Sequence, residues 1–319
     1  MPRSYSRIVI TGGAGFIGSH IVDRIVEESR EVVVIDDLSQ GRLENISGHL
    51  NKKNFKFIKA DIRDLAKVEE IVKDADAIFH EAAIASVTKS FEDPIYTNDV
   101  NVSGTLNLLK ACLNSNVEKF IYASSCAVYG DAEAPHQSEE TQTLPKSPYA
   151  ASKIAAENYC KTYNRLYGLE VIILRYFNVY GPRESYGPYS GAITKFIDRL
   201  MGGEPPVIHG DGEQTRDFVE VSDVVEANML ALERSSVLSE PINIGTGIAT
   251  SIKDLANLLI DITGRKHLKP AFDQPRTGDI RHSCADISKA RRVLGYEPKI
   301  PLREGLVKLL KDYGEPFRC

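Results

Sequence analysis

The sequence predicts an α/β protein built on a doubly wound parallel sheet, with a smaller, interleaved C-terminal domain. Short β-branched runs alternate with helical patterns through the first half of the chain, and this alternation is typical of βαβ units. The runs are apolar almost without interruption, which suits parallel strands buried on both faces. After about residue 178 prolines and glycines interrupt the pattern, which indicates shorter elements and loops.

The individual elements follow in order along the chain. Strands are expected at residues 7–11, 31–36, 55–60, 77–81, 119–125 and 170–177, where β-branched and aromatic residues gather. Helices are expected between them, at residues 15–29, 65–73, 98–114 and 149–167. In the C-terminal half, residues 241–245 (PINIG) are expected to add a sheet strand, and residues 251–263 and 288–294 to form helices.

Composition and charge exclude several classes of function. Lys and Arg number 39 and Asp and Glu 44, so the net charge is −5, without the basic stripe of a nucleic-acid binder. No run approaches about 18 consecutive apolar residues, so no membrane span is expected. The five scattered cysteines fit free thiols in a reducing cytoplasm better than a disulfide framework. The seven histidines show no close ligand pair, so no metal is expected.

A glycine-rich turn follows the first expected strand. Residues 11–18 (TGGAGFIG) place glycines at positions 12, 15 and 18. Without side chains the backbone can turn sharply and approach a pyrophosphate, to which the N-terminal amides of the next helix donate. The second strand ends in Asp36, a carboxylate placed to accept both hydroxyls of an adenosine ribose. This combination predicts a Rossmann-type, dinucleotide-binding domain.

The acidic residue also bears on which dinucleotide binds. Asp36 and the adjacent Asp37 repel a 2′-phosphate, which favours NAD over NADP, although Arg42 lies close enough in the sequence to offer a phosphate partner. After the third strand, Asp61 and Ile62 are placed to meet the adenine amino group. A turn at the strand end explains Asp61 equally well.

Tyr149 and Lys153 stand four positions apart in an expected helix and therefore share one face. A free phenol has a pKa near 10 and is a poor base at neutral pH. A neighbouring ammonium, together with a positive nicotinamide ring, favours the phenolate. Tyr149 can then accept the proton of a substrate hydroxyl; a solvated helix face is the alternative.

Ser124 and Ser125 close the fifth expected strand. The carboxyl ends of strands are where open α/β sheets bind ligands, and a hydroxyl there can hold a reacting oxygen in place. The alternative for either serine is a strand-end residue whose hydroxyl is satisfied locally.

The combination of motifs resembles the extended short-chain dehydrogenase/reductases of the nucleotide-sugar epimerase family. The segments that carry the resemblance are residues 11–18 (TGGAGFIG), 124–130 (SSCAVYG), 149–153 (YAASK), 174–182 (LRYFNVYGP) and 210–218 (GDGEQTRDF). The resemblance implies a bound NAD, a UDP-sugar substrate, and a homodimer built from helices such as 98–114 and 149–167.

The expected domains follow from the motifs and from the prolines and glycines that interrupt the strand–helix alternation after about residue 178. Residues 1–177 are expected to form the NAD-binding domain, with a returning segment near 218–246. Residues 178–319 are expected to form mainly the substrate domain.

The resemblance also implies roles for individual residues. Ser125 matches the catalytic serine or threonine of the family, and Tyr149 and Lys153 match its base and the partner of that base. The implied cofactor contacts are Gly12, Gly15, Phe16, Ile17, Gly18, Asp36, Asp37, Asp61, Ile62, Ala82, Ala83, Asn101, Ser124, Tyr149, Lys153 and Phe177. The implied substrate contacts are Ser125, Tyr149, Asn178, Arg216, Arg276, Asp279 and Ser283. Two arginines suit a diphosphate; an ion pair with a neighbouring acid is the alternative for Arg216.

Cys126 and Ala127 narrow the implied chemistry. At these positions similar dehydratases have Asp and Glu and similar decarboxylases also have a Glu, because eliminating water needs an acid and a base. Neither Cys126 nor Ala127 can supply a carboxyl group, which favours simple epimerisation. We interpret Cys126 as a small filler with weak thiol character.

The expected sugar depends on one position. Seven residues after Arg276, similar epimerases restricted to plain hexoses have a bulky tyrosine, and those that admit N-acetylhexosamines have a small residue; here it is Ser283. We therefore expect a UDP-sugar 4-epimerase that interconverts UDP-N-acetylglucosamine and UDP-N-acetylgalactosamine, and also UDP-glucose and UDP-galactose. The alternatives are an epimerase of UDP-glucuronate or another nucleotide sugar, a dehydratase or decarboxylase, and a non-enzymatic NAD-binding regulator. For Ser283 itself, the alternative is that it only lines a solvent-exposed surface and does not contact the sugar.

Overall fold

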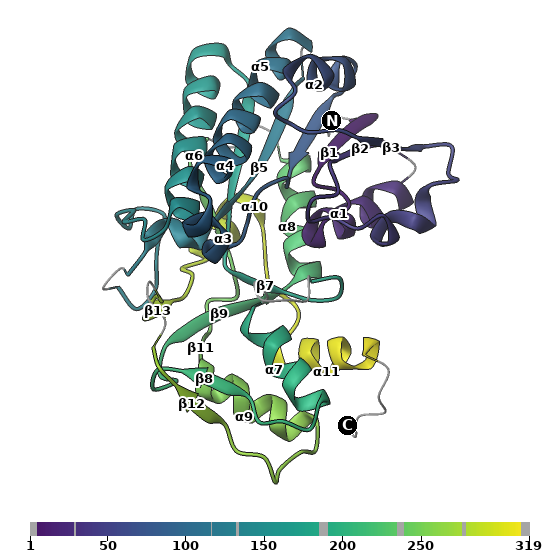
Figure 1. Ribbon diagram of the computed structural model, residues 1–319. Coiled ribbons are helices and arrows are strands. Elements are labelled where there is room, and N and C mark those ends of the chain that lie inside the picture. Colours follow the sequence, from purple (N-terminus) through teal and green to yellow (C-terminus); the bar gives the residue numbers. More distant parts are fainter. Residues whose placement is uncertain are drawn as a thin grey trace.

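A seven-stranded parallel sheet forms the centre of the molecule in the computed structural model (Figure 1), which describes residues 5–28, 30–115, 117–131, 134–184, 191–234, 239–275 and 279–313. The strand order is β10-β6-β5-β4-β1-β2-β3. The strands are β1 (Arg7–Thr11), β2 (Glu31–Asp36), β3 (Phe55–Lys59), β4 (Ala77–His80), β5 (Lys119–Ser125), β6 (Glu170–Tyr176) and β10 (Ile242–Ile244). The order reverses between β1 and β4, and ligands bind at such a switch point in open α/β sheets.

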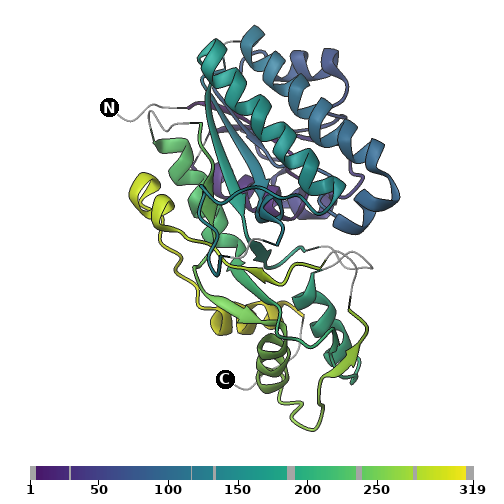
Figure 2. The same ribbon diagram turned by 90° about the vertical axis from the view of Figure 1, so that its left-hand side faces the viewer.

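Helices cover both faces of this sheet, and the apolar runs in the sequence are the reason. In β1, Ile8 and Ile10 are buried in one core while Val9 is buried in the core on the opposite face. The first core is closed by α1 (Phe16–Glu27), α8 (Val221–Glu233) and α10 (Ser288–Leu294). The second is closed by α2 (Leu65–Val72), α5 (Thr105–Ser115) and α6 (Pro148–Tyr167), the layer that faces the viewer in Figure 2. The predicted doubly wound α/β fold is confirmed.

The expected helix over 98–114 is wrong in detail. The structure has α4 (Pro94–Asn98), then a π-helical turn over Asp99–Gly104, and only then α5 (Thr105–Ser115). A π-turn widens the helix by one residue and commonly marks functional sites. Here it turns the buried Asn101 toward the loop that follows β4, with which its side chain bonds. A hydrophobic periodicity does not reveal such a local widening.

A second group of elements lies below the carboxyl ends of the main strands (Figure 1) and has its own apolar core. Its main strand, β9 (Thr215–Glu220), pairs with β7 (Asn178–Tyr180), β11 (Ala249–Ser251) and β13 (His282–Ser283), and β8 (Val207–His209) pairs with β12 (Ala271–Asp273). Its helices are α7 (Ala192–Met201), α9 (Ile252–Ile262) and α11 (Leu302–Asp312). The helices α7, α8 and α11 were not expected from the sequence.

The chain passes between these two groups of elements more than once. After β9 it forms α8, which packs against α1, and then β10, which pairs with β6 at the edge of the main sheet. Further on, α10 packs against β10 and α8. The remaining short elements are α3 (Val87–Glu92) and the 3₁₀ turns over Leu43–His49 and Cys126–Tyr129.

No helix in the described parts of the chain is long and apolar enough to cross a membrane. The described cysteines, Cys112, Cys126, Cys160 and Cys284, are free thiols. Among the described residues, no three His, Cys, Asp or Glu side chains are grouped as metal ligands.

Candidate active site

The turn between β1 and α1 is shaped by its glycines. Gly12 has a φ of +68°, which L side chains rarely adopt, and a Cβ there would lie 2.6 Å from the amide nitrogen of Ala82. At Gly18 a Cβ would lie 3.0 Å from the Cα of Gly13. The turn therefore packs closely against the loop after β4, and α1 begins directly behind it at Phe16. The N-terminal amides of α1 suit a pyrophosphate.

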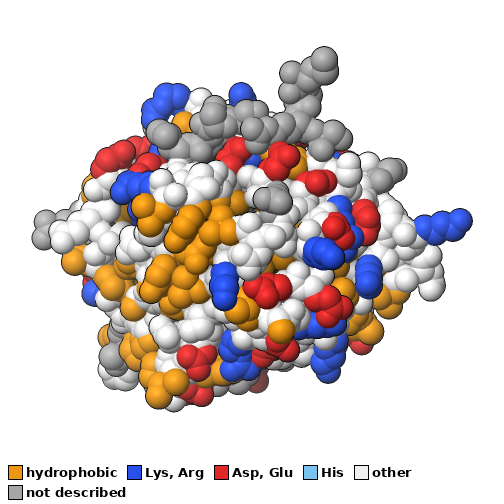
Figure 3. All heavy atoms as spheres, turned by 90° about the horizontal axis from the view of Figure 1, so that it is seen from above, with side chains coloured by type: hydrophobic (Ala, Val, Ile, Leu, Met, Phe, Trp, Pro, Cys, Tyr) orange, Lys and Arg blue, Asp and Glu red, His pale blue; other side chains and the backbone are white. Residues whose placement is uncertain are grey.

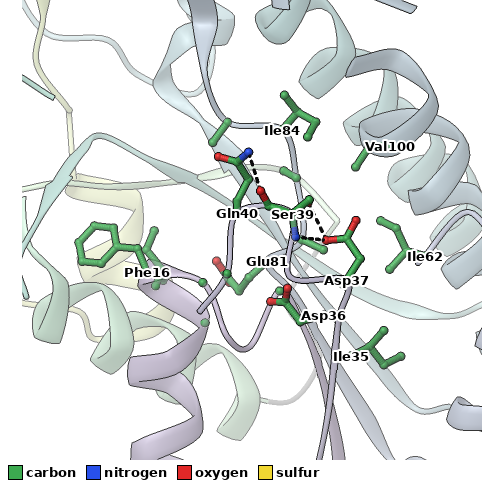
Figure 4. A pocket seen from close by; sticks show the side chains of 18 of the residues that line it. Phe16, Ile35, Asp36, Asp37, Ser39, Gln40, Ile62, Glu81, Ile84 and Val100 are labelled. Carbon is green, nitrogen blue, oxygen red and sulfur yellow. Dashed lines mark hydrogen bonds between the residues drawn. The ribbon is translucent and has the colours of Figure 1, made fainter. Parts of the chain in front are cut away.

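A cavity of about 390 Å³ lies over this turn, at the carboxyl ends of β1 to β4 (Figure 4). The predicted cofactor residues that line it are Gly12, Gly15, Phe16, Ile17, Gly18, Asp36, Asp37, Asp61, Ile62, Ala82 and Ala83. Ser39, Gln40, Glu81, Ile84, Tyr96 and Val100 line it as well, and sequence reasoning missed them. They lie on the segments after β2 and β4, on α4 and on the π-turn, and these segments meet at the cavity only in the folded protein.

Asp36 is held at the inner wall of this cavity. Its two carboxylate oxygens accept the backbone amides of Ala14 (3.0 Å) and Leu38 (2.9 Å), so each keeps a lone pair for a ribose hydroxyl. Burial raises the pKa of Asp36, and both amide bonds oppose that rise. A Cβ at Gly41 would lie 2.7 Å from the carboxylate, so a larger residue there would displace the Asp36 side chain.

The surroundings of Asp36 suit a ribose without a phosphate. Asp37, which accepts the amide of Ser39 at 2.8 Å, adds a second carboxylate to the cavity wall. Arg42 is exposed and is not among the residues that line the cavity. Asp61 forms a close two-pronged pair with Arg63, which lowers the pKa of the Asp61 carboxyl. The Asp61 carboxylate is therefore charged at neutral pH, and its contact with the adenine amino group remains a prediction.

The three predicted catalytic residues lie together. Ser147 caps the N-terminus of α6 by accepting the amide of Ala150 (3.1 Å), which places Tyr149 in the first turn and Lys153 one turn later. The Ser125 side chain lies close enough to the Tyr149 phenol to lower its pKa. The Lys153 ammonium lies 6.0 Å from the centre of the Tyr149 ring and donates to the Ala123 carbonyl at 2.7 Å.

Burial controls the charge of both titratable members of this group. It raises the pKa of Tyr149 to about 12, while the Ser125 side chain opposes that rise. It lowers the pKa of Lys153 to about 8, while nearby acids oppose that change. The phenol is therefore neutral at pH 7, and Lys153, 6.0 Å from the centre of the Tyr149 ring, is charged below about pH 8.

Three predicted cofactor residues lie behind the site, outside the set that lines the cavity. Ser124 donates to Glu157 at 2.5 Å, and Glu157 forms a buried ion pair with Arg175. Phe177 is buried against the ring of Tyr129, with ring centres 6.3 Å apart.

The third of these, Asn101, has its amide group fully engaged. It accepts from the amide of Ile84 (2.8 Å) and donates to the Ile84 carbonyl (3.1 Å) and the Ser152 hydroxyl (2.9 Å). Asn101 thus joins the loop after β4 to the catalytic helix α6, and its direct contact with a cofactor remains a prediction.

A second cavity, of about 680 Å³, lies among β7, α7, β8 and β9. Three predicted substrate residues, Asn178, Arg216 and Asp279, line it. Arg216 donates to Asp279 at 2.5 Å and to the Ile280 carbonyl at 2.7 Å, so the ion pair weighed as its alternative exists in this structure. Arg276 lies outside the described residues.

Ser283 connects this second cavity to the catalytic group. It pairs in register with Arg216, β13 beside β9, and its side chain lies near the Cys126 thiol, whose pKa both Ser283 and Ser125 lower. Ser283 is only 5% exposed. A buried position one contact away from Ser125 argues against a residue that merely lines a wet surface.

The parallel sheet, the glycine turn and the grouped serine, tyrosine and lysine define the class of protein first, a Rossmann-type dinucleotide-binding enzyme. The chain belongs to the NAD dependent epimerase/dehydratase family, whose model matches residues 8–245. It is 40% identical over 310 residues to the UDP-glucose 4-epimerase of Mycolicibacterium smegmatis, covering 96% of this chain and 98% of that protein. The predicted family is confirmed, and its cofactor is NAD.

Two solved structures are similar over almost their whole length. The UDP-N-acetylglucosamine 4-epimerase of Methanobrevibacter ruminantium, in complex with UDP-N-acetylmuramic acid, has a TM-score of 0.91 and 40% identity, covering 98% of this chain and 99% of that one. The UDP-glucose 4-epimerase of Thermus thermophilus, in complex with NAD, has a TM-score of 0.86 and 37% identity, covering 96% and 98%.

Proposed function

We propose that the protein is an NAD-dependent UDP-sugar 4-epimerase. The observation that carries the proposal is that Ser125, Tyr149 and Lys153 lie together beside Glu81, a residue that lines the dinucleotide cavity. Tyr149 interacts electrostatically with Glu81 of the first cavity, and the Ser125–Cys126–Ser283 contacts lead to the second. One substrate can therefore meet the catalytic group while its nucleotide occupies the second cavity.

The proposed roles follow from this geometry. Bound NAD supplies a hydride acceptor that later returns the hydride to the other face of the same carbon, so no net redox change occurs. Tyr149 takes the proton of the sugar 4′-hydroxyl and gives it back. Lys153 stabilises the phenolate that Tyr149 forms, and Ser125 orients the reacting oxygen.

The residues that follow Ser125 favour epimerisation over elimination. Cys126 and Ala127 begin the 3₁₀ turn, and the amide of Ala127 donates to the Ser125 hydroxyl at 3.2 Å. Burial raises the pKa of the Cys126 thiol, so it is neutral at pH 7. Neither residue provides a charged group to remove a second proton from the sugar, as a dehydratase requires.

We further propose that the substrates are UDP-N-acetylglucosamine and UDP-N-acetylgalactosamine, together with UDP-glucose and UDP-galactose. The small, buried Ser283 beside Arg216 supports this, because it leaves room near the sugar for an acetamido group. The test is a panel of UDP-hexoses, UDP-N-acetylhexosamines and UDP-uronates with separation of the products. Turnover of UDP-uronates alone would overturn the sugar assignment, and turnover of no UDP-sugar would overturn the epimerase assignment.

We propose that the protein is a homodimer formed through the α4–α6 side of the sheet. Ile95 is 74% exposed, and Leu166 and Tyr167 at the end of α6 are 69% and 59% exposed. Figure 3 shows apolar side chains gathered over one part of the face seen from above. Large apolar side chains gathered on an exposed face are typical of an interface. Light scattering of wild type and of Ile95→Glu with Leu166→Glu tests it, because a monomeric wild type contradicts it.

We also propose a cytoplasmic location, which the free thiols of the described cysteines support. Fractionation of the native host's cells with an antibody against the protein tests this, and recovery from the medium contradicts it.

A further inference from the structure

Glu81 is a carboxylate of the cofactor cavity to which neither the motifs nor the proposed mechanism gives a role. It follows β4 directly, at the switch point of the sheet, and its amide donates to the Thr11 carbonyl at the end of β1 (3.1 Å). Its backbone packs against the glycine turn, since a Cβ at Gly12 would lie 2.9 Å from the Glu81 carbonyl carbon. Figure 4 shows its side chain within the cavity, between Phe16 and Asp36.

Two side chains from other elements fix the orientation of this carboxylate. The Tyr176 hydroxyl, at the end of β6, donates to Oε1 of Glu81 at 2.9 Å. Asn228 of α8 donates to the Tyr176 oxygen at 2.8 Å and to the Val224 carbonyl at 2.9 Å. Its Oδ1 lies 3.1 Å from the same hydroxyl, so the carboxylate of Glu81 is the nearer of two acceptors for the phenol hydrogen. A carboxylate held by a buried donor in this way has little freedom to turn toward solvent.

The charged and titratable groups that face Glu81 belong to the catalytic group and to β6. They are Lys153 and Tyr149 of α6 and Tyr176 of β6. The carboxylate raises the pKa of Lys153 and also raises that of Tyr149. Burial raises the pKa of Glu81 to about 7, while the bond from Tyr176 and the charge of Lys153 favour its ionised form.

We propose that Glu81 sets the reduction potential of the bound NAD, by placing a negative charge at the hydride-transfer end of the cavity. The proposal rests on the assignment of Tyr149 and Lys153 to that end in the proposed function. A nearby carboxylate stabilises the positively charged oxidised nicotinamide relative to the neutral reduced one. NAD is then harder to reduce, so the hydride is returned to the sugar and the keto intermediate stays scarce.

The test is a redox titration of the holoenzyme with a mediator dye, followed by the absorbance of the reduced nicotinamide. Glu81→Gln keeps an oxygen that accepts from Tyr176 and removes the charge. Opposite charges at close range change an equilibrium by about tenfold, so the potential is expected to rise by about 30 mV for this two-electron couple. Because wild-type Glu81 is itself neutral in acid, the difference from wild type should shrink from pH 8 to pH 6.

Asp37→Asn is the matched control, because it removes one carboxylate from the other end of the same cavity. Asp37 is assigned to the adenosine end of NAD, which is chemically the same in the oxidised and the reduced cofactor. The reduction potential of the Asp37→Asn variant should therefore equal that of wild type. A Glu81→Gln potential equal to wild type overturns the proposal, as does an equal shift in the Asp37→Asn variant.

Tyr176→Phe provides a second variant that keeps the carboxylate. Without the hydroxyl donor the pKa of Glu81 rises further, so the potential should exceed wild type at pH 7 and return to it at pH 9. A shift that is the same at both pH values indicates structural damage and overturns the proposal. The titration needs no sugar substrate, so its result does not depend on the sugar assignment. A Tyr149→Phe enzyme with unimpaired turnover, in contrast, would contradict the proposed function on which the role of Glu81 rests.

Discussion

Replacing Ser283 with tyrosine tests the substrate assignment most directly. The side chain is 5% exposed, lies beside Arg216 in the sheet and is close to Cys126, which adjoins Ser125. A phenol ring at this position has no free solvent to enter. It must occupy the space between the catalytic group and the second cavity, where the sugar is proposed to lie.

The magnitude follows from the cost of overpacking. Extra atoms forced into a formed pocket typically cost about 1–3 kcal/mol, which corresponds to a loss of roughly tenfold to a hundredfold in rate. That loss should apply to UDP-N-acetylhexosamines, whose acetamido group needs the space. UDP-glucose and UDP-galactose, with only a hydroxyl at C2, should lose much less.

The assay is kcat/KM for both substrate pairs in wild type, Ser283→Tyr and Ser283→Ala. The alanine variant removes the hydroxyl but adds no volume, so the ratio of its kcat/KM values for the two substrate pairs should stay close to that of wild type. The reasoning is refuted if the tyrosine variant keeps the wild-type ratio. If wild type itself does not act on N-acetylhexosamines, the substrate assignment is wrong while the epimerase chemistry can still hold.

Three further predictions concern the cofactor site and the base. Asp36→Ala should weaken NAD binding by about 1.5–3 kcal/mol, the worth of hydrogen bonds to a charged group; calorimetry with NAD measures this, and NADP extracted from pure wild-type protein would contradict the role of Asp36. Tyr149→Phe should lower kcat by about 10²–10⁴-fold with little change in UDP-sugar affinity, and near-full turnover would show that Tyr149 is not the base. Because the pKa of Lys153 is lowered to about 8, its charge is present below that pH and lost above it, so kcat should fall as the pH rises past 8. A Lys153→Met variant should lack this alkaline fall, and a wild-type rate that stays level up to pH 10 contradicts the assignment.

The sequence by itself determined the fold class and the local parts of the site. The glycine turn at residues 11–18 and the Tyr149–Lys153 pair each lie within one short segment, where backbone sterics and helix periodicity act over a few residues. The strand ends at Asp36 and Ser125 could be located for the same reason, because buried parallel strands are recognisable apolar runs.

Only the tertiary structure decided how distant segments meet. Glu81 bonds Tyr176 across 95 positions of sequence, and Arg216 pairs with Asp279 across 63. The π-turn that presents Asn101, and the helices α7 and α8, likewise follow from packing against neighbours rather than from periodicity. The physical reason is that a side chain's charge, partners and role depend on which elements are packed around it. No local pattern in the sequence records that a carboxylate after β4 lies against the lysine of α6.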